Sequence, residues 1–187
     1  MTPRNCRTSA SAPWLRLLLI VAVMDAGNVT PSMADERSRL TEQAQDATAA
    51  LLKHDPSIKR EIASAAGYAI FPGVGKGGLG IGAARGTGQV ISKGAPLAKA
   101  TLTQVTLGLQ LGGQKYIELI LFENQAALDR FLGGTFAMAA QASAVAAASG
   151  AAANARYSDG VKVITMALGG LMYEASIGGQ KFGIQRY

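Results

Sequence analysis

The chain is poor in the side chains that most enzymes use for chemistry. Among its 187 residues it has one cysteine, Cys6, and one histidine, His54. Cys6 lies in an N-terminal segment that we expect to be removed, which excludes a disulfide framework, a cysteine nucleophile and a thiolate metal site in the mature chain. A lone histidine cannot form a two-histidine metal site, and the scattered acidic residues suggest no carboxylate pair. We therefore expect no enzymatic activity, no cofactor and no metal.

The N-terminal segment also lacks an apolar run of the roughly 20 residues that a membrane-spanning helix needs. Its apolar run, Leu17 to Met24, is preceded by three arginines and followed by the small-residue segment Ser32-Met33-Ala34. This order is typical of a secretory signal peptide over residues 1–34, with an uncleaved anchor as the alternative. The rest, residues 35–187, is predicted to be one exported domain. We expect it in the periplasm, peripherally associated with the membrane.

Positive charge exceeds negative charge, but it is not concentrated. Lysine and arginine number 18 against 12 acidic residues, which gives a net charge of +6. The basic residues are spread singly along the chain, a pattern that favours an anionic membrane surface over the dense footprint of a nucleic-acid-binding protein. We expect anionic phospholipids or a membrane surface as the partner and no nucleic acid, and the sequence identifies no protein partner.

Helical periodicity is confined to three segments. An amphipathic helix is predicted from Asp35, its expected N-cap, to Lys53, with an apolar face at Leu40, Ala44, Ala47 and Leu51. Asp55-Pro56 is predicted to begin a second short helix that ends at Gly67, and Asn124 to cap a third that ends at Leu132. Residues 133–155 are nearly all small, so that periodicity leaves helix and strand both open there.

Glycine divides the remainder into short runs of strand-forming residues. A strand from Tyr68 to Phe71 is predicted to stop at Pro72-Gly73, and turns are predicted at Gly86-Thr87-Gly88, Gly112-Gly113 and Gly169-Gly170. Between them, Val105, Leu107, Leu109 and Leu111 alternate with polar residues and glycine, which predicts that these four face the core. The fold class expected is α+β, with N-terminal helices packed on an antiparallel glycine-rich sheet that bends toward a barrel.

Two glycine motifs bear on binding. The spacing Gly75-x-Gly77-x-x-Gly80 matches a dinucleotide fingerprint, but the residues after it predict a strand rather than a helix, so a nucleotide site is not expected. The pattern glycine-glycine-glutamine-lysine-aromatic occurs at Gly112 to Tyr116 and at Gly178 to Phe182. Either two hairpins share one turn chemistry, or Lys115 and Lys181 lie side by side and present two ammonium groups to an anionic head group.

Lipid phosphates are bound by lysine and arginine side chains and by backbone N–H groups that glycine-rich turns expose. The chain places both kinds of group close together in the sequence. The candidate head-group residues are Lys76, Arg85, Lys115 and Lys181. The candidate glycine-rich turns contain Gly73, Gly75, Gly77, Gly78, Gly112, Gly113, Gly178 and Gly179.

Several of these segments carry a family resemblance. Gly67 to Gly78, the glycines and Arg85 that follow, the turn Tyr157 to Gly160, and the ending Gly170 to Phe182 resemble the SYLF domain, the Ysc84-type lipid-binding module. The chain resembles its small exported bacterial members. The resemblance implies phospholipid binding without catalysis. It departs from the eukaryotic pattern at Gly94-Ala95-Pro96, where the tryptophan is absent, so a phosphoinositide preference is not carried over. The alternative function is an envelope assembly protein that binds other proteins through a sheet edge.

Overall fold

The computed structural model describes residues 32–134, 137–139, 144–146 and 156–187. The chain divides after Thr30, and the second unit, Pro31–Tyr187, contains all the described helices and strands. Over the described residues there are three helices and a five-stranded sheet, so the predicted α+β class is confirmed. None of these helices is long and apolar enough to cross a membrane.

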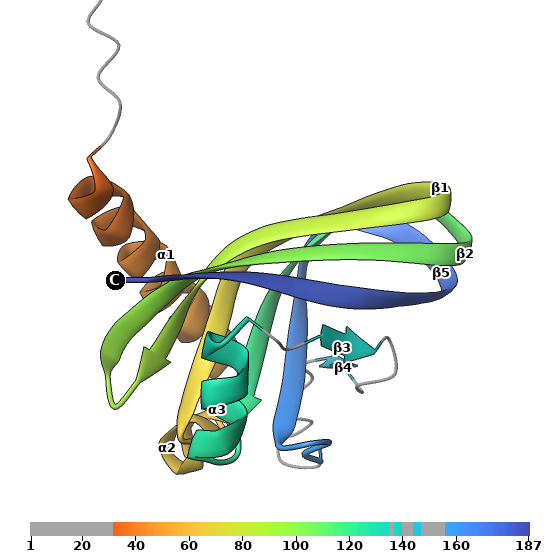
Figure 1. Cartoon of the computed structure of the whole chain (residues 1–187). Coiled ribbons are helices and arrows are strands. Elements are labelled where there is room, and N and C mark those ends of the chain that lie inside the picture. The colour runs from red at the N-terminus through yellow and green to blue at the C-terminus, as the bar shows by residue number, and fades with distance from the viewer. Residues whose placement is uncertain (1–31, 135–136, 140–143, 147–155) are drawn as a thin grey trace, which may run out of the picture. The chain divides into compact units, whose positions relative to one another are not determined.

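Three long antiparallel strands make up most of the sheet (Figure 1). They are β1 (Gly67–Ser92), β2 (Ala95–Phe122) and β5 (Val161–Arg186). The short strands β3 (Ala137–Ala139) and β4 (Ala144–Ala146) both pair with β5, β3 antiparallel and β4 parallel. The strand order is β1-β2-β5-β3, and the sheet is not closed, so the expected bending toward a barrel does not end in closure.

The long strands double back near their middles, as Figure 1 shows, and the middle of each strand is rich in glycine. Gly77 pairs with Gly113 and Gly78 pairs with Gly112 across β1 and β2. A methyl group on Gly78 would lie 2.5 Å from the Cα of Gly82, so only glycine permits the bend. Each long strand therefore contributes to two layers of the same sheet.

Most of the predicted glycine turns are wrong, because these glycines lie within long strands that stay paired. Gly75, Gly77, Gly78, Gly112, Gly113, Gly178 and Gly179 lie in paired strand positions, and Gly73 lies in a bulge of β1 after Phe71. Gly86-Thr87-Gly88 and Gly169-Gly170 also lie within strands, and Pro72-Gly73 bends β1 without stopping it.

The turn between β1 and β2 is Lys93-Gly94, both left-handed with φ of 50° and 78°, which suits a two-residue hairpin. The turn at Asp159-Gly160 is confirmed, with φ of 52° and 75°.

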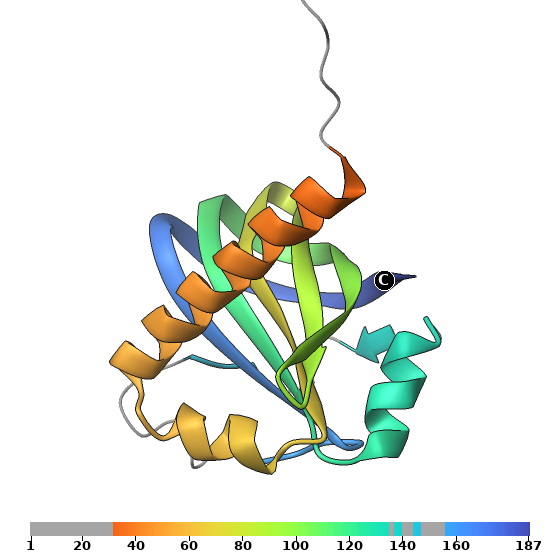
Figure 2. The ribbon, with the colours of Figure 1, turned by 90° about the vertical axis from the view of Figure 1, so that its left-hand side faces the viewer.

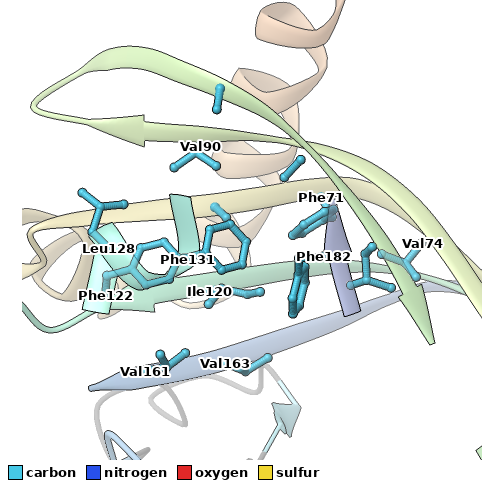
Figure 3. Packing of buried hydrophobic residues seen from close by; sticks show 14 of the residues in the cluster. Phe71, Val74, Val90, Ile120, Phe122, Leu128, Phe131, Val161, Val163 and Phe182 are labelled. Atoms are coloured by element: carbon cyan, nitrogen blue, oxygen red, sulfur yellow. The ribbon is translucent and has the colours of Figure 1, made fainter. Parts of the chain in front are cut away.

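The first core cluster fills the space between the two layers (Figure 3). Phe131 of α3 (Gln125–Leu132) has its ring centroid 4.9 Å from those of both Phe122 and Phe182. The ring centroid of Phe71 in β1 lies 5.9 Å from that of Phe182. A methyl group on Gly88 would meet the Phe71 ring at 2.6 Å, so the glycine makes room for this aromatic packing.

The helix α1 (Met33–His54) crosses one side of the sheet (Figure 2). Its buried residues are the four that periodicity predicted: Leu40, Ala44, Ala47 and Leu51. The last three belong to the second core cluster, with Ile58 and residues of all three long strands. The N-terminal half of α1 is held by polar contacts: Glu36 pairs with Lys99, and Thr41 Oγ1 accepts a 2.9 Å hydrogen bond from Gln89 Nε2. These contacts fix α1 on the sheet, where the helix forms one wall of a cleft.

Helix starts differ from the predictions by a few residues. Ser32, not Asp35, is the N-cap of α1, since its Oγ accepts a 3.2 Å hydrogen bond from the Asp35 amide. Asp55 is buried and accepts hydrogen bonds from the amide and hydroxyl of Ser57, and α2 (Ile58–Ser64) begins only after this turn.

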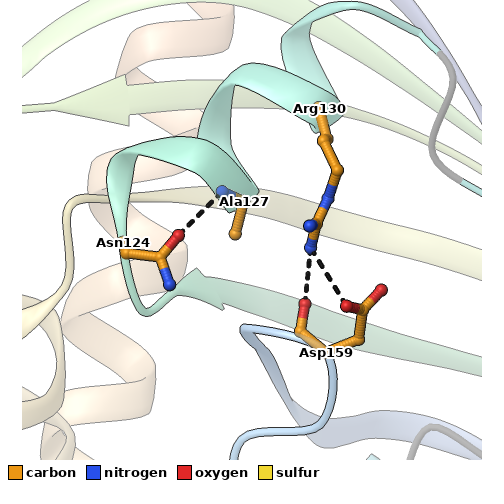
Figure 4. A network of polar contacts seen from close by, with 4 residues as sticks. All are labelled: Asn124, Ala127, Arg130 and Asp159. Carbon is orange, nitrogen blue, oxygen red and sulfur yellow. Dashed lines mark hydrogen bonds and ion pairs between the residues drawn. The ribbon is translucent and has the colours of Figure 1, made fainter.

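The predicted cap of α3 is confirmed (Figure 4). Asn124 accepts a 3.0 Å hydrogen bond from the Ala127 amide. Arg130, also in Figure 4, ties α3 to the turn before β5 by a 2.7 Å hydrogen bond to the Asp159 carbonyl. The helix ends before the small-residue segment, in which the structure describes only the short strands β3 and β4; the remaining residues from 135 to 155 lie outside the described part.

Candidate functional site: an apolar patch, a cationic row and a cleft

The alternating segment of β2 faces the opposite way from its prediction. Val105, Leu107 and Leu111 are exposed, and Thr106 between them is buried. The buried pair between these exposed residues is Gly82 of β1 and Thr106 of β2, so in the doubled part of the sheet small residues face inward and the large apolar side chains face outward. The expectation that these leucines and Val105 face the core is wrong; the side chain of Leu109 is outside the described set.

The outward leucines meet apolar neighbours on β1. Leu79 pairs with Leu111, Ile81 with Leu107 and Ala83 with Val105. The five large side chains of this group are more than half exposed: Leu79 79%, Ile81 66%, Val105 56%, Leu107 62% and Leu111 60%. We call these five residues the apolar patch. A soluble protein rarely exposes several large apolar side chains on neighbouring strand positions unless the surface binds something.

A row of exposed polar side chains borders the apolar patch. Two residues beyond Ala83 and Val105, Arg85 of β1 pairs with Thr103 of β2, which pairs in turn with Lys181 of β5. All three are exposed and, by strand periodicity, lie on the same face as Val105 and Leu107. Two strand spacings separate Arg85 from Lys181, about 10 Å. We call Arg85, Thr103 and Lys181 the cationic row.

A cleft of about 740 Å³ lies between α1 and the sheet, next to Arg85. Arg85 and Thr87 of β1 and Lys115 of β2 line it together with Asp46 and Gln43 of α1, and Pro72, Gly73 and Ile117 contribute to its walls. The Lys115 stem lies over Gly73, where an added methyl group would meet its Cε at 2.7 Å. Neither Arg85 nor Lys115 forms an ion pair with an acidic group in the part of the chain that the structure describes.

The four cations nominated from the sequence therefore separate into three environments. Arg85 belongs to both the cationic row and the cleft, Lys181 to the row and Lys115 to the cleft. Lys115 pairs with Gly75 and Gly169, whereas Lys181 pairs with Thr103 and Ala137, so the two lysines do not lie side by side in the sheet. Lys76 is half-buried, and its charge acts on Glu118 in the interior.

Glu118 is a functional candidate that the sequence reasoning missed. It is 1% exposed, and its Oε2 accepts a 3.0 Å hydrogen bond from Gln180 Nε2. Its Oε1 and the Oε1 of Gln180 are buried and accept no hydrogen bond from the described residues. Burial raises the pKa of the Glu118 carboxyl to about 7, against the lowering effects of the Gln180 hydrogen bond and the Lys76 charge. A single acidic residue inside the apolar run from Tyr116 to Phe122 was the signal that could have found it.

Histidine, cysteine and acidic side chains do not gather in groups of three anywhere in the described ranges. His54 is exposed at the C-terminal end of α1. The candidate site consists of the three surface features defined above: the apolar patch, the cationic row and the cleft.

Comparison with known proteins gives a distant relative. No protein-family model matches the chain. Beta cell expansion factor A of Aeromonas veronii is 28% identical over 162 residues, an alignment that covers 84% of this chain and 61% of that protein. The chain thus spans less than two thirds of the length of this relative, to which it is similar over most of its own length.

Proposed function

We propose that this protein is a SYLF-type (Ysc84-type) lipid-binding protein that is exported, attaches to the periplasmic surface of a membrane and binds anionic phospholipid without chemical turnover. The observation that carries the proposal is the position of the apolar patch directly beside the cationic row. The resemblance of the glycine-rich segments to SYLF domains supports the same function. In this proposal the bend of the long strands is the part that meets the membrane.

The two surfaces match the two layers of a lipid leaflet. Apolar side chains such as Ile81 and Leu107 gain about 1.5–3 kcal/mol each when they leave water completely, so partial insertion of five of them supplies several kcal/mol. Arg85 and Lys181 lie about 10 Å apart on the adjoining surface, and each basic residue near an anionic leaflet adds about 1 kcal/mol. A purely apolar partner would leave these cations without a role, whereas a phospholipid surface uses both.

Removing both charges of the cationic row tests this arrangement. We expect the double variant Arg85→Gln/Lys181→Gln to bind anionic vesicles about 30-fold more weakly than the wild type at low salt, since two contributions of about 1 kcal/mol are lost. The difference should shrink at high salt, because screening removes the same contribution from the wild type. The matched control is Lys53→Gln/Lys59→Gln, which removes two exposed lysines from the helices. Equal losses in the two double variants would show that only overall charge matters and would contradict a specific membrane-facing row.

A second function is favoured by the strand order. β1 is an edge strand of 26 residues, and an edge strand can pair with another chain. An envelope protein that binds partners in this way would self-associate, and salt would have little effect because backbone hydrogen bonds carry no net charge. Sedimentation at low and high salt separates the two proposals: salt-insensitive dimers without vesicle binding would favour the edge, and salt-sensitive vesicle binding by a monomer would favour the phospholipid surface.

A further inference from the structure

The cleft between α1 and the sheet has a composition different from that of the membrane-facing surface. Arg85 and Lys115 come from neighbouring strands and line it together, and neither forms an ion pair with an acidic side chain among the residues described. Gly73 leaves the space in which the Lys115 stem lies. Two exposed cations that line the same hollow are an arrangement suited to binding an anion.

We propose that this cleft is a binding site for one phosphate group, held by Arg85 and Lys115. The guanidinium of Arg85 can bind two phosphate oxygens at once, and the ammonium of Lys115 supplies a second positive charge. Thr87 lines the same cleft and offers a hydroxyl donor.

The charges of the cleft indicate which kind of phosphate fits. Arg85 and Lys115 contribute two positive charges, and Asp46 on α1 contributes one negative charge. The net charge of +1 is neutralised by a phosphodiester, which carries one negative charge, whereas a phosphate monoester carries nearly two at neutral pH. A phosphodiester is the linkage in the head groups of most phospholipids, and Ala47, Ala50 and Leu168 provide apolar contacts for the carbon atoms beside it.

The lipid source of this phosphate rests on the proposed function, but the site itself does not. Arg85 belongs to both the cleft and the cationic row, and Leu168 lines the cleft while it remains 47% exposed. The cleft is therefore open beside the proposed membrane-facing surface and can take a head group from it. Lys115 lies outside the cationic row, which makes it the residue that separates the two sites experimentally.

The test titrates the purified protein with two water-soluble probes, dihexanoyl phosphatidylglycerol below its critical micelle concentration and inorganic phosphate. Backbone amide NMR signals of Gly73 and Gly86 report binding in the cleft, and calorimetry gives the affinity. We expect Lys115→Gln and Arg85→Gln each to weaken binding of the short-chain lipid at least about tenfold, the effect of losing one charged hydrogen bond. The matched control, Lys59→Gln on α2, removes an exposed lysine that does not line the cleft and should bind like the wild type.

Gly73→Ala is an independent variant that keeps both charges. Its methyl group would meet the Lys115 Cε at 2.7 Å, and the flexible lysine stem can move aside without disturbing the backbone. Gly73 does not have a left-handed φ, so alanine fits the backbone there. We expect an unchanged unfolding midpoint and an affinity for the short-chain lipid reduced severalfold, because the ammonium group is displaced.

The outcomes separate the two proposals. Binding of the short-chain lipid alone identifies the phosphate as part of a lipid head group, and equal binding of inorganic phosphate identifies the phosphate group itself as sufficient. No shift of the Gly73 and Gly86 signals by either probe, or equal affinity in Lys115→Gln and Lys59→Gln, would overturn the cleft site. If wild-type protein still bound anionic vesicles in that case, the proposed function would stand and only the cleft would be lost.

Discussion

Replacing Glu118 by glutamine is expected to stabilise the protein at pH 8 by about 3 kcal/mol and to change its stability little at pH 4.5. Burial raises the pKa of this carboxyl from 4.5 to about 7, partly offset by the Gln180 hydrogen bond and the charge of Lys76. One pKa unit corresponds to about 1.4 kcal/mol, which gives about 3 kcal/mol for the whole shift. A side chain that sequence inspection passed over thus has one of the largest expected effects on stability.

The sign follows from the direction of the shift. The unfolded chain releases the Glu118 proton near pH 4.5, and the folded chain holds it until about pH 7. Between these values folding takes up a proton, so this residue lowers the free energy of unfolding as the pH rises and contributes its full penalty above pH 7. Glutamine is neutral at every pH, and its side-chain oxygen can accept the Gln180 hydrogen bond that Oε2 accepts in the wild type.

Urea unfolding of the wild type and Glu118→Gln from pH 4.5 to 8.5 measures this effect. The difference between their free energies of unfolding should grow through pH 5–7 and then level off. Glu123→Gln, which removes an exposed carboxylate five residues along the chain, is the matched control for the loss of one negative charge. A constant difference between wild type and Glu118→Gln across this range would contradict a buried, proton-holding carboxyl.

The second large effect concerns the apolar patch. We expect the double variant Ile81→Gln/Leu107→Gln to bind anionic vesicles about 100-fold more weakly, because two inserted side chains each lose about 1.5 kcal/mol. The two residues pair across β1 and β2 and are 66% and 62% exposed, so their replacement removes no core packing. The free energy of unfolding should change by no more than about 0.5 kcal/mol, as for ordinary surface substitutions.

The control for this variant is Met33→Gln on α1. Met33 is 64% exposed, like the patch residues, but lies at the start of a helix. Vesicle co-sedimentation of both variants gives a direct comparison. A loss of the same size in Met33→Gln, or unchanged binding by the double variant, would show that the patch does not contact lipid.

The helices were predictable because their signals are local. The spacing of Leu40, Ala44, Ala47 and Leu51 sets one face of α1, and the buried residues of the helix are these four. Asn124 capped α3 as predicted, since a side-chain oxygen and an amide three residues on are enough to define a cap. Where a nearby residue could also cap, as with Ser32 and Asp35, the N-cap lies three residues from its predicted position.

The strands were not predictable in the same way, because glycine has two uses that look identical in a sequence. In short hairpins it makes turns, whereas Gly78 and Gly112 here bend long strands that remain paired on both sides of the bend. The alternation of β2 was seen correctly, but its direction was reversed: periodicity says that Val105 and Leu107 share a face, and only the doubled sheet decides that this face is outside. The cationic row depends on cross-strand register, which brings Arg85 and Lys181 together from positions 96 residues apart.

Vesicle co-sedimentation of the wild-type protein is the direct test of phospholipid binding. Neutral vesicles and vesicles that contain phosphatidylglycerol are compared at low and high salt. We expect binding to the anionic vesicles at low salt, much weaker binding at high salt and little binding to neutral vesicles, since both the apolar patch and the cationic row are needed. Failure to bind the anionic vesicles at low salt would contradict a phospholipid-binding function.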